Sequence, residues 1–173
     1  MRIAWVTPLP PTPSGIADYA FELLPLVAES AETDVFATRP GRFRRPSRPS
    51  GVRVLDASLL GERFGDYDAV FHHLGNNPHH EFVYRASLAL PGVAVFHDFS
   101  LHHLIAHLTV EMGADDLPGY EHTLEEDYGP SGVRLARLRW HGVASEFEKF
   151  LFPANGHVAR NAKALIVHSQ DVR

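Results

Sequence analysis

Short apolar runs recur along the chain and alternate with segments whose apolar residues repeat at helical spacing. The runs, rich in β-branched and aromatic residues, lie at 2–7, 33–38, 52–55, 67–74, 92–97 and 163–169. Helical patterns occupy 78–90, 99–112 and 154–162. Near-continuous apolar runs are typical of strands buried on both faces of a parallel sheet. Strands joined by helical crossovers therefore predict an α/β fold, with a mostly parallel sheet and helices on both faces.

A further helical pattern follows a proline-rich loop near the N-terminus. Its apolar residues recur at helical spacing from Ile16 to Val27, and Ser14 precedes them as a candidate N-cap. Pro25 falls inside the pattern, where the loss of one backbone donor predicts a kink. We therefore expect a helix that begins after Ser14 and bends near Pro25.

The start of this helix carries Gly15. In an open parallel sheet, the loop after the first strand faces the crevice beyond the carboxyl ends of the strands. Glycine lets the backbone approach a ligand closely, and the free amides of a helix start suit a phosphate. Because no complete glycine-rich phosphate motif is present, the local sequence equally allows Gly15 to ease a tight turn.

The chain length of 173 residues fits one domain. Residues 115–150 interrupt the alternation of strands and helices with an acid-rich and then an arginine-rich helical sequence. We expect this segment to form an elaboration over one edge of the sheet.

Composition narrows the classes of partner. A net charge of -5 argues against nucleic acid, because a protein that binds its backbone normally carries a basic field. The absence of cysteine excludes a disulfide framework and a thiolate metal site, and it suits a reducing cytoplasm. The sequence shows no signal peptide and no apolar run long enough to span a membrane. We expect a cytoplasmic protein.

Twelve histidines are the main anomaly of the composition, and two segments, 72–81 and 96–107, hold many of them. Each segment lies at the end of a predicted strand, so both should reach the same edge of the sheet. His97 could hydrogen-bond a substrate hydroxyl through either ring nitrogen. Asp98 could fix the tautomer of His97 or cap the next helix, and His97 could equally be a packing residue. The helical histidines at 102, 103 and 107 are expected to pack or to face solvent.

Three segments, 1–27, 72–104 and 161–173, together resemble the N-terminal Rossmann-like half of family-4 glycosyltransferases, the retaining group with the GT-B fold. The resemblance covers residues 1–110 and 154–173, but not 111–150. Enzymes of this group have two Rossmann-like domains that face each other across a cleft. The N-terminal domain holds the acceptor and the C-terminal domain holds a nucleotide-sugar donor. The resemblance implies glycosyl transfer with retention of anomeric configuration and no obligatory metal.

Carried onto this sequence, the resemblance places Gly15, with Ser14 and Ile16, against the donor diphosphate. The family often has two adjacent glycines where this chain has Ser14 and Gly15. His97 matches the strand-end histidine directed at the transferred sugar, and Asp98 matches its usual neighbour, so both are expected to be catalytic. Residues expected on the acceptor side are Asp18, Tyr19, Asn76 and Asn77.

The resemblance also implies a donor-binding half that residues 1–173 do not contain. That half carries a basic pair for the phosphates and a spaced pair of glutamates for nucleotide and sugar. Near the C-terminus, Ser169 and Asp171 suggest a helix start that the chain does not continue. We therefore expect residues 1–173 to be the N-terminal domain of a longer enzyme, inactive by itself. The implied partners are a nucleotide sugar and a sugar, lipid-linked or small-molecule acceptor.

Two alternatives from other functional classes stay open. One is a non-catalytic Rossmann-type module that binds a nucleotide or a sugar. The other is a histidine-rich, metal-dependent hydrolase, because His103 and His107 have the spacing of a zinc-binding helix. That helix would need glutamate where Leu104 stands, and no third ligand is evident.

The segment 39–53 contains six arginines and no acidic residue. Such runs are usually solvated loops. A sharper interpretation is that they bind anionic lipid headgroups or a phosphate on the acceptor, with Phe43 as an interfacial anchor. This interpretation predicts peripheral association with the inner face of a membrane through Arg39, Arg42, Arg44, Arg45 and Arg48.

Overall fold

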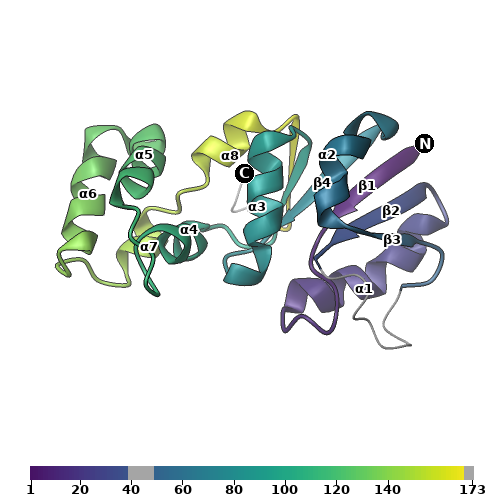
Figure 1. Cartoon of the computed structure of the whole chain (residues 1–173), viewed down its shortest axis with the longest axis horizontal. Coiled ribbons are helices and arrows are strands. Elements are labelled where there is room, and N and C mark those ends of the chain that lie inside the picture. Colours follow the sequence, from purple (N-terminus) through teal and green to yellow (C-terminus); the bar gives the residue numbers. More distant parts are fainter. Residues whose placement is uncertain (39–48, 170–173) are drawn as a thin grey trace.

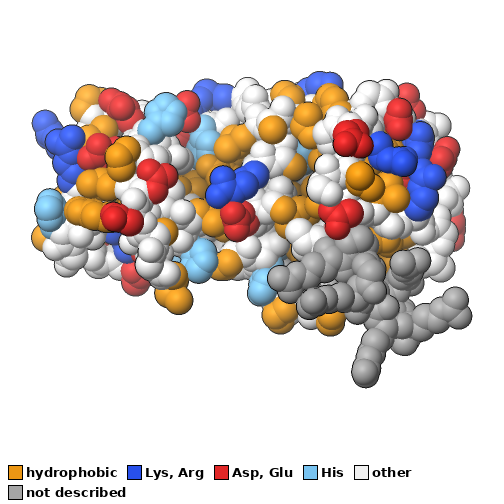
Figure 2. All heavy atoms as spheres, in the orientation of Figure 1, with side chains coloured by type: hydrophobic (Ala, Val, Ile, Leu, Met, Phe, Trp, Pro, Cys, Tyr) orange, Lys and Arg blue, Asp and Glu red, His pale blue; other side chains and the backbone are white. Residues whose placement is uncertain are grey.

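The computed structural model describes residues 1–38 and 49–169. Most of the arginine-rich loop therefore lies outside the described residues, including every arginine expected at a membrane: Arg39, Arg42, Arg44, Arg45 and Arg48. Within the described residues, no helix has the length and apolar character needed to cross a bilayer. Figure 2 shows acidic and basic side chains interspersed over the described part of one face.

The six apolar runs form the six strands of one parallel sheet (Figure 1). The strands are β1 (Arg2–Val6), β2 (Glu32–Ala37), β3 (Arg53–Asp56), β4 (Ala69–Leu74), β5 (Val93–Phe96) and β6 (Ala164–Val167). Their order is β3-β2-β1-β4-β5-β6, and every neighbouring pair is parallel. This is the Rossmann-like α/β fold that the pattern predicted. The order reverses between β1 and β4, and a ligand crevice is expected beyond the carboxyl ends of these two strands.

Helices cover both faces of the sheet, because successive side chains of a strand point to opposite faces. On one face, Ile3 and Trp5 of β1 pack with Ala20 and Leu24 of α1 (Gly15–Ala28). On the other face, Ala4 and Val6 belong to a second cluster with helical side chains. The helices that contribute to it next to the sheet are α2 (Leu60–Arg63), α3 (Glu81–Ala89), α4 (His102–Thr109) and α8 (Gly156–Asn161).

A helical lobe extends beyond the β6 edge of the sheet, as predicted for residues 115–150 (Figure 1). It comprises α5 (Leu117–Tyr128), α6 (Pro130–Trp140) and α7 (Glu148–Leu151), which pack next to α4. Buried Tyr120 and Leu135 of the lobe belong to the same apolar cluster as the second face of the sheet. The lobe and the sheet therefore share one continuous core.

Helix α1 continues through Pro25, as the pattern predicted, and the kink expected there stays a prediction. Other local details differ from the patterns. Helix α4 begins at His102, later than the pattern indicated, where the Ser100 hydroxyl accepts the His102 amide at 3.2 Å. Short 3-10 turns that the patterns did not distinguish are Ala57–Leu59, Phe64–Asp66 and Pro78–His80.

Candidate functional site

Three histidines line the carboxyl edge of the sheet on the face covered by α1. His73 lies in β4, His97 directly follows β5, and His168 directly follows β6. The His73 and His97 ring centroids are 5.2 Å apart, and those of His97 and His168 are 4.6 Å apart. The ring of His73 also stacks on Trp5 of β1 at 4.2 Å, which places it beside the switch point between β1 and β4. We call these three residues the histidine row.

The exposure of the histidine row increases from the sheet centre outward. His73 is only 2% exposed, His97 is half-buried and His168 is exposed. A hydrogen bond of 2.9 Å joins His73 Nδ1 to His97 Nε2. His97 is therefore held from the inside while part of its ring remains accessible from the crevice.

Burial sets the charge state of this pair. It lowers the pKa of His73 well below the usual 6.5, and the nearby His97 lowers it further. Burial also lowers the pKa of His97 to about 4, with His168 as the second cause. Both rings are therefore neutral near pH 7, each with one N–H donor and one acceptor nitrogen. In this state His97 can hydrogen-bond a hydroxyl without adding a full charge to the site.

The first turn of α1 adjoins the histidine row. The centroid of the Tyr19 ring lies 5.0 Å from that of His97 and 5.8 Å from that of His168, and both contacts are edge to face. Tyr19 and its neighbour Asp18 are both exposed. The structure thus brings the expected phosphate-binding helix start and the expected strand-end histidine to one edge of the sheet.

Gly15 begins α1 in open surroundings. A Cβ at this position would meet no atom within 4 Å, and the backbone φ lies outside the left-handed region. Neither a strained turn nor close packing among the described residues therefore requires glycine here. As the first residues of the helix, Gly15 and Ile16 have amides without an acceptor one turn earlier. The Ile16 side chain is buried toward Gly75, so only its backbone faces the helix start.

Ser14 occupies the N-cap position, but its side chain forms no cap hydrogen bond. Its hydroxyl instead lies 3.2 Å from Nε2 of the buried His80. His80 Nδ1 lies 3.0 Å from the carbonyl of His73, so Nδ1 donates and Nε2 accepts from Ser14. The predicted N-cap position of Ser14 is confirmed, but its hydroxyl bonds His80, in the 3-10 turn after β4, instead of an amide of α1.

Asp98, Asn76 and Asn77 make local contacts rather than contacts with the histidine row. The Asp98 carboxylate accepts the Asn76 amide at 2.7 Å. The Asn76 side chain accepts from the Leu104 amide at 3.0 Å and donates to His103 Nδ1 at 2.8 Å. Asn77 accepts from the His79 amide at 3.0 Å and caps the following 3-10 turn. These bonds fasten the loop after β4 to α4, and ligand contacts by these residues stay predictions.

The side chain that hydrogen-bonds His97 is His73, whereas Asp98 accepts the Asn76 amide. The sequence analysis did not single out His73. His73 lies inside an apolar run, which indicates burial and nothing more. His73 lies two residues after Phe71, so its side chain points to the same face of the sheet as Phe71 and Trp5, the face covered by α1. The alternation along β4 shows this only once β4 is known to lie beside β1.

The hypothesis of a metal-dependent hydrolase has no support from the side chains of residues 1–38 and 49–169. No group of three or more histidine, aspartate and glutamate side chains there is arranged to hold a metal ion. His103, half of the zinc-like spacing, already uses Nδ1 to accept the Asn76 amide.

Comparisons with known proteins yield little. No protein-family model and no curated protein matches the chain. Among solved structures, the glycosyltransferase SnogD from Streptomyces nogalater is similar, with 23% identity and a TM-score of 0.35. The match covers 92% of this chain and 42% of SnogD, so the chain spans less than half the length of that protein. At this TM-score the likeness carries no weight for activity, and the fold is assigned from the strand order itself.

Proposed function

We propose that the carboxyl edge is half of a glycosyltransferase active site, which transfers a glycosyl group from a nucleotide sugar with retention of anomeric configuration. One observation carries the proposal: the open start of α1 and the accessible face of His97 meet beside Tyr19, whose ring lies 5.0 Å from His97. This meeting point lies on the α1 side of the edge where parallel sheets of this order bind ligands. The resemblance to family-4 glycosyltransferases in the same segments supports the same reaction.

Each residue at this edge has a role that follows from its chemistry. The amides of Gly15 and Ile16, at the positive end of α1, stabilise charge on the leaving diphosphate. Neutral His97 hydrogen-bonds the transferred sugar and holds it in line with the acceptor. Asp18 and Tyr19, both exposed on the first turns of α1, contact the acceptor or the sugar. This division leaves nucleotide recognition to a second half.

The second half belongs to the proposal as well. A diphosphate bound by two amides alone would be held weakly, because tight sites enclose most of a ligand's surface. We therefore expect turnover to require a donor-binding domain opposite this edge. Residues 1–173 assayed alone should show no transfer from any nucleotide sugar.

The test is a transfer assay with a panel of nucleotide sugars, on the protein that carries this chain together with a donor-binding half. His97→Ala should lower kcat more than it raises KM, because the lost interaction acts mainly in the transition state. The matched control is His122→Ala, since His122 is 73% exposed and lies in the lobe. Wild-type kcat in His97→Ala, or a product of inverted anomeric configuration, would contradict the proposal.

A further inference from the structure

His73 is the most buried member of the histidine row, and its surroundings are unusual for a packing residue. One ring face stacks on Trp5 at 4.2 Å, and Nδ1 bonds His97 Nε2 at 2.9 Å. The other ring nitrogen, Nε2, is buried and has no hydrogen-bond partner. Buried polar atoms are nearly always paired in folded proteins, with protein groups or with ordered water.

Two further buried polar atoms on the α1 face of the sheet have no hydrogen-bond partner. They are Nε1 of Trp5, which lies in β1, and Oγ1 of Thr7, which directly follows β1. Thr7 is one residue beyond Val6, and His73 is one residue beyond His72, the register partner of Val6. Because the three orphaned atoms belong to neighbouring strand ends, an ordered water between them would satisfy several of them together.

The chemistry of these atoms indicates the direction of the bond to His97. The indole Nε1 of Trp5 can only donate, while the Thr7 hydroxyl can donate or accept. A water that accepts from the indole can either donate to His73 Nε2 or accept from it, so the water does not set the direction. A buried N–H without a partner is rarer than an acceptor without one. The proton of neutral His73 therefore belongs on Nδ1, which has a partner in His97, and Nε2 is the acceptor.

Other described neighbours of His97 contact it in different ways. The Asp98 carboxylate is directed to the Asn76 amide. His168 meets His97 through ring faces 4.6 Å apart at a tilt of 34°. Tyr19 meets it edge to face. The hydrogen bond that reaches an imidazole nitrogen of His97 comes from His73.

We propose that His73 is a positioning residue, which donates from Nδ1 to His97 Nε2 and thereby fixes His97 in one orientation and one tautomer, with its proton on Nδ1. His97 then presents a hydrogen-bond donor to an oxygen of the bound sugar. A buried second histidine thus decides whether the accessible one donates or accepts. The role in transfer rests on the proposed function, whereas the tautomer is a property of the unliganded chain.

The experiment is NMR of the chain with 15N-labelled histidine at pH 7, which identifies the protonated ring nitrogen of His97. We expect Nδ1–H in the wild type. In His73→Phe, which keeps an aromatic ring against Trp5, we expect that preference to be lost. His168→Phe is the matched control, because it changes a ring neighbour without removing the hydrogen bond, and the tautomer of His97 should persist.

A second variant, His73→Asn, separates loss of the hydrogen bond from loss of folding. Asparagine can place an amide donor near the position of Nδ1, so His73→Asn should keep the Nδ1–H tautomer. In the transfer assay, His73→Phe should lower kcat by up to about 100-fold with little change in KM, the cost of a misplaced reacting group. An Nε2–H tautomer in the wild type, or an unchanged tautomer in both His73 variants, would overturn the proposal. If the tautomer behaves as expected but no transfer occurs, the proposed function fails and the positioning role stands.

Discussion

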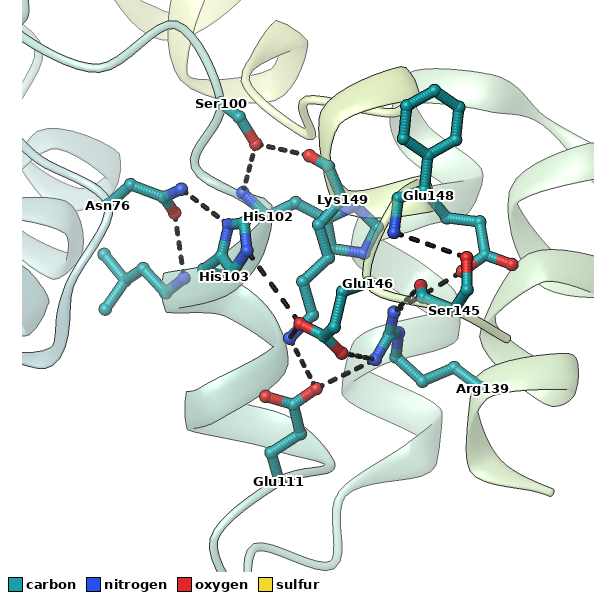
Figure 3. Close-up of polar contacts among 12 residues, drawn as sticks. Asn76, Ser100, His102, His103, Glu111, Arg139, Ser145, Glu146, Glu148 and Lys149 are labelled. Atoms are coloured by element: carbon teal, nitrogen blue, oxygen red, sulfur yellow. Dashed lines mark hydrogen bonds and ion pairs between the residues drawn. The ribbon is translucent and has the colours of Figure 1, made fainter. Parts of the chain in front are cut away.

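Buried polar side chains gather in two regions of the molecule, the histidine row and a charged cluster in the helical lobe, and the two regions differ in the charge of these groups. In the histidine row, burial keeps the hydrogen-bonded pair of His73 and His97 neutral near pH 7. In the lobe, ion pairs connect charged residues from the loop after α4, from α6 and from around α7 (Figure 3). This lobe network consists of Glu111, Arg139, Glu146, Glu148 and Lys149.

The lobe network pairs buried cations with carboxylates. Lys149 is 3% exposed, and its ammonium lies 2.7 Å from Glu111 and 3.0 Å from Glu146. Arg139 reaches the same two carboxylates at 3.0 and 3.1 Å. Nearby, His102 donates to the Phe152 carbonyl at 2.6 Å and accepts from the Tyr120 hydroxyl. Opposite charges compensate one another in this network, which indicates a structural role.

The difference separates a region that holds the fold from a region that serves a ligand. A buried ion-pair network loses stability when one partner is removed, because the remaining charge is left buried. The neutral pair of His73 and His97 carries no such charge, and the half-buried His97 can still bond a ligand. The comparison therefore predicts large stability effects in the lobe and mainly functional effects at the carboxyl edge.

The largest effect should come from acid, which acts on both regions. Burial lowers the pKa of His102 and of His97 to about 4, and it also lowers the pKa of His72, His73 and His80. Unfolded histidines titrate near 6.5, so the unfolded chain binds more protons between pH 6.5 and about 4. The unfolding free energy should hold above pH 6.5 and fall steadily below it, by up to about 1.4 kcal/mol per pH unit for each fully buried group.

Urea denaturation at several pH values measures this slope. His102→Gln should reduce the slope of the unfolding free energy against pH by an amount that corresponds to nearly one proton, because His102 is fully buried. His97→Gln should flatten it less, because His97 is only half-buried and solvent screens its charge. An unfolding free energy that stays constant from pH 7 to 4 would show that these histidines are protonated in the folded state as readily as in the unfolded state, and would contradict this prediction.

The next largest effect is expected from Lys149→Met. The substitution keeps the aliphatic stem but leaves the carboxylates of Glu111 and Glu146 with Arg139 as their remaining cation in the network. We expect a loss of about 3 kcal/mol, at the low end for breaking a buried ion pair because Glu146 is largely exposed. Arg137→Met is the control within the lobe, since its pair with Glu121 involves a side chain that is 64% exposed and should cost far less. Equal losses in the two variants would show that burial of the lobe network adds nothing to its contribution to stability.

The smallest stability effect should be a gain at the carboxyl edge. Gly15→Asp places a better helix former and a favourable negative charge in the first turn of α1, where a Cβ meets open space. We expect the unfolding free energy to rise by about 0.5 kcal/mol. A loss of more than 1 kcal/mol in thermal or urea unfolding would mean that Gly15 is needed for the fold and would remove the argument that it is kept for a ligand.

The sequence predicted what depends on local pattern and left out what depends on strand order. The six apolar runs became strands and the stripe from Ile16 became α1, because burial and periodicity are local properties. The place of His97 at a strand end was predicted for the same reason, since it directly follows an apolar run. His73 was not, because its meaning depends on β4 lying beside β1. The lobe network was also missed, since Glu111 and Lys149 are far apart in the chain and meet only through packing.

The most direct test of the carboxyl edge as a ligand site is a titration of the 15N-labelled chain with uridine diphosphate, followed through amide chemical shifts. We expect saturable shifts at Gly15, Ile16 and His97, with Kd no tighter than about 1 mM because few contacts hold the diphosphate. Gly15→Asp should abolish these shifts while stabilising the fold, and the control Gly61→Asp, also in open space, should retain them. Shifts that fall on Lys149 and the lobe network instead, or shifts at the carboxyl edge that survive Gly15→Asp, would contradict the assignment of the ligand site to this edge.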